Sequence, residues 1–564
     1  MALAAFVLFF NLAGARTLTF HEGLVAVVAR EMVASGDWIV PRFGGVPRLE
    51  KPPLAAWLVA GLSRVTGGVD EWTARLPAAL SGLLLVCLIG SWGIRWYGRR
   101  AGLLAAVVQS TTVYTITQAR LGEVDMTLCL LTTAALFLVA TEHADEPKPM
   151  GHLRWIAFYL FVGISWLGKF IAGPVLVLVP AAIYLLVRDG ARGLVRLLNP
   201  IGAMCFSALV AFWPALVARE IPQAWATWHD EIVGRSLGAM GREPPWYYFY
   251  AILWLMLPWT PATIAALPQS WRRGWKEGET RERFLWTWFL GQLALLSLSA
   301  FKHQHYIIPA LPALSLMTGR WLDGALASGA RLNSRGLSRR AAVAGMIVLA
   351  GIGSGAIFIA GRRWPELILP LGLGIGMGAL GGCVAIGLLY LGRIRAAALA
   401  ALLVFIACYL GAVGWLLPRR DPRLPAVEFA RKADARVPAG RPVVLYAMGP
   451  SPLAFYLKRG FVREESVAGL RERLGREGTI YVIARTAALG EIEKFARIRR
   501  IEETRNPTES FLRKNPPLSL VEVAQGPVAV SDQVSAAANA ASARDRGGPA
   551  AGSAGRVVEK LRSD

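Results

Sequence analysis

Long apolar runs recur along this chain from its first residues almost to position 417, and this pattern limits the possible folds most strongly. A helix of roughly 20 predominantly apolar residues crosses the hydrocarbon core of a bilayer. The runs predict about thirteen transmembrane helices. We place them near residues 2–15, 76–96, 101–117, 126–140, 155–168, 171–187, 201–217, 248–267, 284–299, 306–322, 342–360, 367–391 and 396–416.

Composition supports an integral membrane protein over a soluble one. Of the 564 residues, 54% are hydrophobic and only 18% are charged, which is too apolar for a soluble chain of this size. The net charge of +23 is divided among short loops between apolar runs, whereas a nucleic-acid-binding protein concentrates such charge on one face. We therefore predict membrane lipids as partners and no nucleic acid.

The charges also predict an orientation. Every second short loop is basic, at positions 95–100, 188–196, 272–283, 331–340 and 393–395, and the positive-inside rule assigns such loops to the cytoplasm. The intervening connections then face outward, including residues 16–75, 120–125, 220–247 and 301–305. The first run lacks a basic flank, so we interpret it as an anchor in preference to a cleaved signal peptide.

Three regions follow from these patterns. Residues 1–417 form a transmembrane domain whose first outward loop spans about 16–75. Residues 418–524 are predicted to form a small periplasmic α/β domain, with strands at 442–448 and 478–485 and a helix at 451–459. The tail at 525–564, rich in Ala, Gly, Ser and Arg, is predicted to be disordered.

The first outward loop is the expected location of the chemistry, because loops longer than about 15 residues inside a compact architecture are usually functional. It contains the run HEGLVAVVAREMVASGDWIVPRFGGVPRLEKPPLAAWL, followed by EWTARLP; KHQHYIIPALP occurs later. Together these motifs resemble the protein O-mannosyltransferase and aminoarabinose transferase group of GT-C glycosyltransferases, in that family's order across most of residues 18–320. The resemblance implies an all-α polytopic fold, a catalytic acid in the first outward loop and a polyprenyl-phosphate sugar donor.

The expected catalytic acid differs from the family pattern. That loop in the family usually opens with an Asp-Glu pair, whereas this chain has His21 and Glu22. An imidazole does not replace a permanently anionic carboxylate, so we predict Glu22 as the catalytic acid, with His21 as a base or acceptor-orienting group. The alternative is that Glu22 is a solvated acid at a helix end.

A second carboxylate is expected at the outward end of the fourth span. The run RLGEVDMTL places Asp125 there, where the resemblance also implies an acid, and Glu123 is its nearby competitor. A charged group at a membrane boundary costs free energy unless it is paired or hydrated, which favours a functional role. Snorkelling of the side chain to the interface is the alternative.

Cations complete the predicted site. Lys51, followed by two prolines, resembles the lysine that holds the lipid phosphate in relatives, and Lys169 resembles a second family lysine. A polar cluster directly precedes the IIPALP stretch, and an aromatic run closes a later outward loop. These two groups supply the remaining donor-binding candidates, Lys302, His303, His305, Tyr306, Arg242, Tyr247 and Tyr248. Surface lysines and an ordinary interfacial aromatic belt are the alternatives.

These residues predict a glycosyltransferase that inverts the anomeric carbon, as the resemblance implies, and acts at the periplasmic face of a bacterial inner membrane. Phosphate is a good leaving group, so fixed cations and one positioned carboxylate meet the demands of transfer. No cofactor is predicted to be required; a divalent cation is conceivable at His303 and His305, but two histidines without a third ligand do not define a metal site.

Two other classes remain open at this point. A transporter or flippase of a lipid-linked substrate shares the helices and basic loops, although it has no need of a long outward loop with Glu22 and Lys51. A non-catalytic scaffold is the other alternative, since His21 departs from the family pattern. The sequence leaves open whether the sugar is a hexose or a pentose, and whether the acceptor is lipid A or another lipid, a glycan or a protein.

Overall fold

The computed structural model describes residues 1–140, 151–237, 242–327, 393–419, 421, 424–448, 452–504 and 517–526, with a few isolated positions between 372 and 388. The chain divides into two compact units. The first consists of residues 1–430 and 450–456, and the second of residues 431–449 and 457–564.

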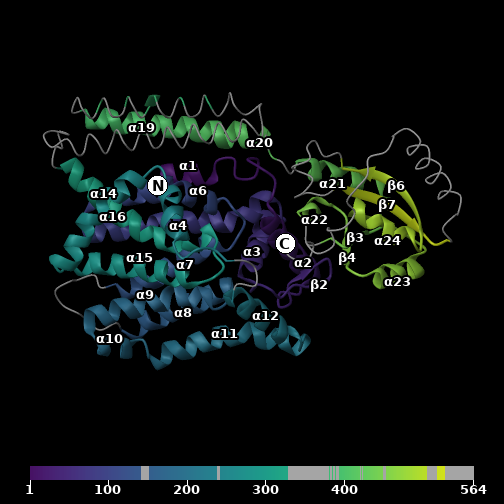
Figure 1. The fold of residues 1–564 in the computed structure, drawn as a ribbon, viewed down its shortest axis with the longest axis horizontal. Coiled ribbons are helices and arrows are strands. Elements are labelled where there is room, and N and C mark those ends of the chain that lie inside the picture. Colours follow the sequence, from purple (N-terminus) through teal and green to yellow (C-terminus); the bar gives the residue numbers. More distant parts are fainter. Residues whose placement is uncertain are drawn as a thin grey trace, which may run out of the picture. The chain divides into compact units, whose positions relative to one another are not determined.

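In the part that the structure describes, the first unit is built almost entirely of helices (Figure 1). Only a two-residue strand pair, β1 (Arg42–Phe43) with β2 (Val46–Pro47), interrupts this pattern. The helices of its first half are α1 (Ala2–Phe9), α2 (Phe20–Ser35), α3 (Leu54–Thr66), α4 (Glu71–Tyr97), α5 (Arg99–Thr111), α6 (Val113–Ala119), α7 (Asp125–Val139), α8 (His152–Lys169), α9 (Ala172–Asp189) and α10 (Ala191–Arg196).

The second half of this unit continues the helical pattern. Its elements are α11 (Pro200–Glu220), α12 (Ala224–Leu237), α13 (Tyr247–Leu255), α14 (Thr260–Trp271), η1 (Arg272–Lys276), α15 (Thr280–Leu298), η2 (Gln304–Ala310), α16 (Leu311–Ala327), α19 (Ile394–Tyr409), η4 (Leu410–Leu416), α20 (Leu417–Arg419), the first part of α21 (Leu424–Arg436), and α22 (Leu453–Tyr456).

Each predicted span within the described residues contains a helix, but α1 covers only residues 2–9 of the predicted 2–15, and several helices are shorter than a bilayer requires. Among the described residues, four helices are long and apolar enough to cross a membrane: α4, α9, α11 and residues 399–419. A fifth is obtained if α13 and residues 260–276, bent by 118°, count as one broken span. The predicted span at 342–360 lies outside the described residues, and the one at 367–391 lies outside them except for a few isolated positions.

The first predicted loop is largely helical, which the sequence analysis did not anticipate. Helix α2 begins with a capping box, in which the Thr19 hydroxyl accepts a hydrogen bond from the Glu22 backbone N–H and the Glu22 carboxylate accepts one from the Thr19 backbone N–H. It ends at Gly36, whose φ of +75° favours glycine. Two segments of this loop therefore hold their side chains on helices, which place functional groups more rigidly than an irregular loop does.

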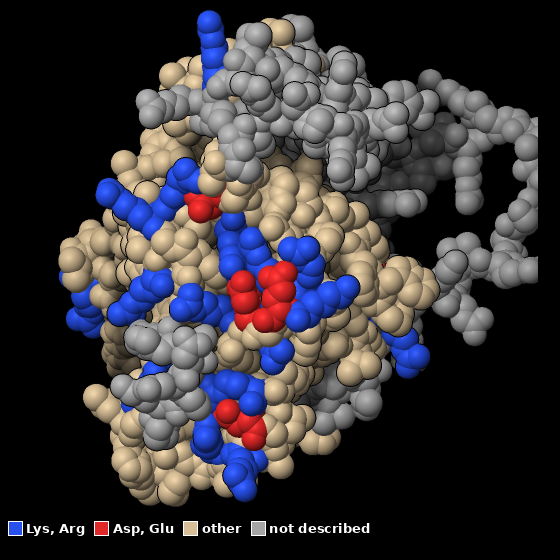
Figure 2. Space-filling view, turned by 90° about the vertical axis from the view of Figure 1, so that its left-hand side faces the viewer, with Lys and Arg blue, Asp and Glu red and all other residues tan. Residues whose placement is uncertain are grey.

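Three of the basic connections, at residues 95–100, 188–196 and 272–283, lie at one end of the helices of the first unit. Arg281 at the start of α15 donates a hydrogen bond of 2.5 Å to the Trp96 carbonyl oxygen at the end of α4. Arg100 forms an ion pair with Asp323 near the end of α16. Figure 2 shows that Lys and Arg side chains crowd this face, with acidic side chains among them. This clustering agrees with the loop-charge pattern that predicts a cytoplasmic side.

The second unit contains a five-stranded sheet in the order β4-β3-β5-β7-β6. Its strands are β3 (Val443–Tyr446), β4 (Phe461–Glu464), β5 (Thr479–Arg485), β6 (Arg497–Glu503) and β7 (Leu518–Ala524), with helices α23 (Val467–Glu477) and α24 (Leu489–Glu493). Strands β3 and β5 pair in parallel, and β7 pairs antiparallel with β5 and β6. The two predicted strands are present, whereas the predicted helix at 451–459 is reduced to the four residues of α22.

Candidate active site

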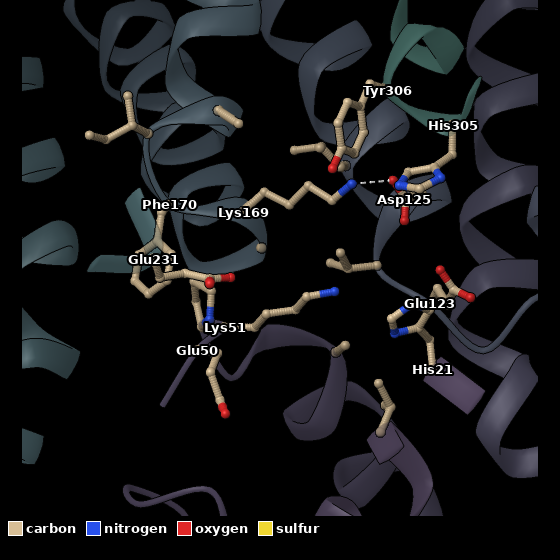
Figure 3. A pocket seen from close by; sticks show the side chains of 18 of the residues that line it. His21, Glu50, Lys51, Glu123, Asp125, Lys169, Phe170, Glu231, His305 and Tyr306 are labelled. Atoms are coloured by element: carbon tan, nitrogen blue, oxygen red, sulfur yellow. Dashed lines mark hydrogen bonds and ion pairs between the residues drawn. The ribbon is translucent and has the colours of Figure 1, made fainter. Parts of the chain in front are cut away.

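One large cavity of about 440 Å³ lies within the first unit, and segments distant in sequence line it. Its polar wall comes from the start of α2, the segment before α3, the turn before α7, the end of α8 and η2 (Figure 3). The side chains on this wall are His21, Arg48, Glu50, Lys51, Glu123, Asp125, Lys169, His305 and Tyr306. The sequence analysis considered seven of these nine residues for a site, and the cavity brings these seven together. The other two are Arg48 and Glu50.

An apolar wall faces these polar groups. It includes Val175 and Leu176 on α9 together with Leu295 and Leu296 on α15. Helices α9 and α15 pack against each other along their length, which holds these side chains beside the cavity. The cavity thus combines a charged end with a hydrocarbon surface, as a lipid bearing a polar head group would require.

Asp125 and Lys169 form an ion pair inside the cavity. Asp125 is the first residue of α7 and is only 4% exposed, and one of its carboxylate oxygens lies 2.5 Å from the Lys169 Nζ. The Lys169 ammonium group also lies 4.7 Å from the centre of the Tyr306 ring, within range of a cation–π interaction. An anion at the first residue of a helix is favoured by the helix dipole as well. This arrangement fixes a buried negative charge and a partly buried positive charge side by side.

Glu123 differs from Asp125 although it lies only two residues away. Its side-chain oxygens accept no hydrogen bond and form no ion pair with the described residues. Burial, together with the negative charges of Asp125 and Glu22, raises the pKa of Glu123 to about 7. A carboxyl group in this state exchanges a proton readily near neutral pH.

The two imidazoles of the cavity are held neutral. Partial burial, reinforced by Lys51 and Arg48, lowers the pKa of His21 to about 4. Burial lowers the pKa of His305 to about 3, since the attraction of Asp125 is opposed by Lys169, His303 and Lys51. Both rings therefore offer hydrogen-bonding nitrogen atoms at pH 7 but are weak bases.

Lys51 extends into the cavity from the segment that precedes α3. Its side chain points toward the space between His21 and Lys169 (Figure 3). The following Pro52 and Pro53 restrict the backbone, with a φ of −85° at Pro53, which limits the positions open to this segment. The cavity thus contains two lysine ammonium groups that approach from different elements.

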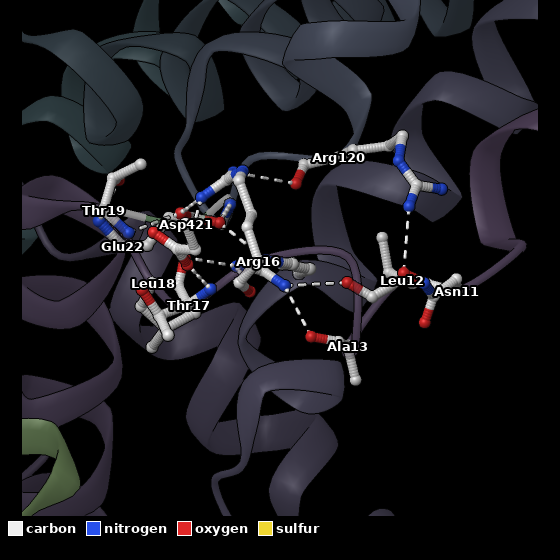
Figure 4. Close-up of polar contacts among 12 residues, drawn as sticks. Asn11, Leu12, Ala13, Arg16, Thr17, Leu18, Thr19, Glu22, Arg120 and Asp421 are labelled. Atoms are coloured by element: carbon white, nitrogen blue, oxygen red, sulfur yellow. Dashed lines mark hydrogen bonds and ion pairs between the residues drawn. The ribbon is translucent and has the colours of Figure 1, made fainter. Parts of the chain in front are cut away.

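Glu22 is placed outside this cavity, in contrast to its neighbour His21. It is fully buried, and its carboxylate binds Arg75 at 2.8 Å and Arg16 at 2.6 Å. The backbone N–H groups of Thr19 and Gly122 donate the remaining hydrogen bonds, at 2.8 and 3.0 Å. Figure 4 shows how Glu22 and its partners surround the start of α2.

The two arginines of this cluster also bind the chain that precedes α2. Arg75 donates to the carbonyl oxygens of Leu12, Ala13, Arg16 and Thr17. Burial alone would raise the pKa of Glu22, but the charges of Arg75 and Arg16 and their hydrogen bonds hold it at about 2. Glu22 is therefore a permanent anion whose acceptor positions are occupied by protein groups, and it is not the solvated acid that the sequence analysis kept as an alternative.

The remaining predicted donor-binding residues do not line the cavity. Lys302 is 3% exposed, and its ammonium group binds the carbonyl oxygens of Ser299 and Glu243. Tyr248 donates a hydrogen bond of 3.2 Å to the His303 carbonyl oxygen. Arg242, His303 and Tyr247 are likewise absent from the cavity wall, and Arg242 is exposed.

Sequence reasoning missed several contributors. Arg48 and Glu50 line the cavity beside Lys51, and Glu231 reaches it from α12. Arg75 lies inside the EWTARLP motif, so the motif itself was the signal that this arginine has a specific partner. Among the described residues, no group of three or more His, Cys, Asp and Glu side chains has a geometry that could hold a metal ion.

Known proteins match the chain over the same region. Residues 50–217 match the family described as dolichyl-phosphate-mannose-protein mannosyltransferase. The chain is 29% identical over 316 residues to undecaprenyl phosphate-α-4-amino-4-deoxy-L-arabinose arabinosyl transferase 1 of Pseudomonas fluorescens, and 30% identical over 341 residues to transferase 2 of that organism. These matches cover 55% and 57% of this chain, and 56% and 55% of the two relatives, so the chain spans little more than half the length of either.

A solved structure extends the likeness to most of the chain. ArnT from Cupriavidus metallidurans, crystallised with undecaprenyl phosphate, superposes with a TM-score of 0.74 at 20% identity, covering 93% of this chain and 98% of ArnT. The fold is therefore that of this polytopic membrane protein. The resemblance to GT-C transferases of the mannosyltransferase and aminoarabinose transferase group, which the sequence motifs indicated, is confirmed.

Proposed function

We propose that this protein is an integral membrane glycosyltransferase that moves a sugar from a polyprenyl-phosphate donor to a lipid, glycan or protein acceptor. The observation that supports this most directly is the composition of the cavity, where two lysines, four carboxyl groups and an apolar wall meet. The matched relatives are named as arabinosyl transferases of an undecaprenyl-phosphate sugar, which supports the same class of donor.

The lysines suit the phosphate of such a donor. Departure of the lipid phosphate leaves additional negative charge on its oxygen atoms, and fixed cations stabilise that charge as it develops. Lys51 and Lys169 reach the cavity from separate elements, so together they can hold one phosphate from two sides. The apolar side chains of α9 and α15 then take the first units of the prenyl chain.

Asp125 suits the sugar ring. Its buried carboxylate would stabilise the positive charge that develops at the anomeric carbon, provided that a bound phosphate draws Lys169 toward itself. His21 would orient the acceptor as a neutral hydrogen-bonding group. A single displacement at the anomeric carbon would invert its configuration. The proposal requires no metal or other cofactor.

Glu22 has a different role in this proposal from the one expected from sequence. Its carboxylate accepts hydrogen bonds from Arg16, Arg75, Thr19 and Gly122 and does not line the cavity. We assign it as a positioning residue that joins the start of α2, which carries His21, to the turn that carries Glu123. The catalytic contacts are left to the residues of the cavity.

The basic connections support an orientation for the site. Their clustering at one end of the helices suggests that this end is cytoplasmic, in a bacterial inner membrane. The cavity, built from the intervening connections, would then face the periplasm, where lipid-linked sugars and lipid A or protein acceptors meet. Whether the transferred sugar is a pentose or a hexose is left to experiment.

The test is transfer of a labelled sugar from undecaprenyl phosphate-α-4-amino-4-deoxy-L-arabinose, with the purified protein and a membrane extract as the source of acceptors. Wild type is expected to transfer the label, and Lys51→Ala is expected to weaken binding of undecaprenyl phosphate about 10- to 100-fold, the value of a charged hydrogen bond. Lys494→Ala, an exposed lysine of the second unit, is the matched control.

The outcomes separate this proposal from the transporter alternative. Labelled donor that crosses the bilayer of a vesicle without transfer would indicate a flippase. Absence of both transfer and binding of undecaprenyl phosphate by wild type would contradict the transferase. Equal loss of binding in Lys51→Ala and Lys494→Ala would show that charge in general, and not the cavity, attracts the lipid.

A further inference from the structure

Transfer to a hydroxyl group requires a proton acceptor, and the polar groups of the cavity differ in their fitness for that task. Asp125 pairs with Lys169 in this structure and faces the sugar ring in the proposed function. Glu22 is outside the cavity with its acceptor positions occupied. His21 and His305 face the cavity, but their surroundings disfavour the protonated ring. None of these four groups is a strong base at neutral pH.

Two further carboxylates, those of Glu50 and Glu231, line the cavity. Glu50 is 51% exposed and lies 3.8 Å from Arg48, so solvent screens its charge. Glu231 reaches the cavity from α12, across from the turn before α7 (Figure 3). Both lie away from the ion pair of Asp125 and Lys169, where a phosphate and a sugar would meet in the proposed function.

Glu123 combines the properties that the other groups lack. Figure 3 shows Glu123 beside the His21 ring on the wall of the cavity. Its oxygens accept no hydrogen bond from the described residues. Its backbone is fixed, because the Gly122 N–H binds Glu22 and the Glu123 N–H binds the Leu121 carbonyl oxygen at 2.7 Å. The group is thus held in place while its acceptor atoms remain available to a ligand.

We infer that Glu123 is the catalytic residue that accepts the proton of the acceptor, and that the acceptor is an uncharged hydroxyl group; this inference rests on the proposed function. The acceptor oxygen forms a bond to the anomeric carbon. The bond between that carbon and the phosphate oxygen breaks, and its electron pair leaves with the lipid phosphate. The hydroxyl proton passes to the Glu123 carboxylate and is later released to water.

The acceptor class follows from charge. Glu123 and Asp125 place two acidic groups on one side of the cavity, and an anionic acceptor brought against them is repelled. A phosphomonoester acceptor is already ionised at neutral pH, so it also has no proton that requires a base. A hydroxyl group of a glycan, lipid or protein avoids the repulsion and uses the base.

The experiment compares wild type, Glu123→Gln, Glu123→Asp and the control Glu493→Gln, an exposed glutamate of the second unit. Transfer from the labelled donor used above into membrane acceptors is measured between pH 5.5 and 9, and binding of undecaprenyl phosphate is measured by tryptophan fluorescence. The linkage of the labelled product is then tested with mild acid, which cleaves a glycosyl phosphate and leaves an O-glycoside intact.

We expect an acid-stable product. In wild type, kcat/KM should fall as pH drops below about 7, because Glu123 must be deprotonated to act. Glu123→Gln should bind the lipid like wild type but lose about 10²- to 10⁴-fold in kcat, together with the acid limb of the profile. Glu123→Asp should retain the limb at reduced kcat. Glu493→Gln should match wild type.

Two results would overturn the inference while the proposed function stands. One is a product cleaved by mild acid. The other is a wild-type pH profile preserved in Glu123→Gln with kcat within a few fold. If Glu123→Gln does not fold, the wild-type and Glu123→Asp profiles decide, since a flat profile near pH 7 in both contradicts a base at this position. Loss of both transfer and lipid binding in wild type would remove the proposed function and the inference together.

Discussion

Glu22 and Glu123 lie near the same turn before α7, but their side chains have different surroundings. The carboxylate of Glu22 binds the backbone N–H of Gly122, and Glu123 is the next residue along the chain. Glu22 is surrounded by donors, which hold its pKa at about 2, while Glu123 faces a cavity and burial raises its pKa to about 7. Two groups of identical chemistry are thereby fitted for opposite tasks.

This difference shows how burial acts on a carboxyl group. Burial disfavours the ionised form in both cases, and only the partners decide the outcome. Arg16 and Arg75 compensate Glu22 fully, so it suits a structural anion. Glu123 has negative neighbours instead, so it suits proton exchange. Of these two acids, the one with compensating partners suits the architecture, and the one without them suits the chemistry of the cavity.

The largest effect should follow removal of the Glu22 carboxylate. Glu22→Ala leaves Arg16 and Arg75 near one another without their counter-ion, and loss of one partner from a buried pair typically costs about 3–5 kcal/mol. The free energy of unfolding in detergent should fall by that amount. Glu493→Ala, at an exposed site, should change it by less than about 0.5 kcal/mol. A wild-type unfolding free energy in Glu22→Ala would contradict the clustered arrangement.

The pH dependence of the unfolding free energy also tests the contribution of the Glu22 carboxylate. A carboxyl group with a lowered native pKa stabilises the fold above its unfolded pKa of 4.5, and this contribution is lost as pH falls toward about 2. The unfolding free energy of wild type should therefore decline between pH 5 and 3, by about 2 kcal/mol from this group. Glu22→Gln should show a shallower decline. An equal slope in both would assign acid unfolding to other groups.

Much of this architecture could be predicted from the sequence. The apolar runs predicted the helices, and the motifs around Lys51 and Asp125 predicted two contributors to the cavity from separate segments. The two strands predicted in the second unit are present because short β-branched runs such as Val443–Tyr446 carry a local signal. Helices α2 and α3 were hidden inside a segment expected to be a loop, since neither is long enough to span a bilayer.

The different surroundings of Glu22 and its neighbour His21 could not be predicted from the sequence. Adjacent positions on a helix point in directions about 100° apart, so His21 faces the cavity while Glu22 faces Arg75. That outcome depends on contacts with Arg75 and Gly122, which lie 53 and 100 positions away. The sequence analysis thus named both residues of this helix turn but ranked Glu22 first, whereas only His21 reaches the cavity.

A substitution in the turn before α7, which carries Gly122, should have a smaller effect on stability. A Cβ atom at Gly122 would lie 2.6 Å from the carbonyl oxygen of Ala74, so Gly122→Ala must displace the turn. Overpacking of this kind costs about 1–3 kcal/mol, and the shift should lower kcat by misplacing Glu123 and Asp125. Thermal unfolding and transfer assays measure both effects. Gly61→Ala, which meets nothing within 4 Å on α3, is the matched control and should be neutral or stabilising.

The smallest effect concerns the electrostatics of the cavity. Partial burial and the charges of Lys51 and Arg48 together lower the pKa of His21 to about 4. Removal of one cation in Lys51→Ala should raise that pKa toward its ordinary value, and a bound lipid phosphate should raise it in wild type for the same reason, because each change lessens the positive charge that opposes protonation. Histidine-selective NMR titration in micelles measures both shifts. The control Lys494→Ala should leave the His21 pKa unchanged. An unchanged His21 pKa in Lys51→Ala would show that His21 and Lys51 do not share the cavity.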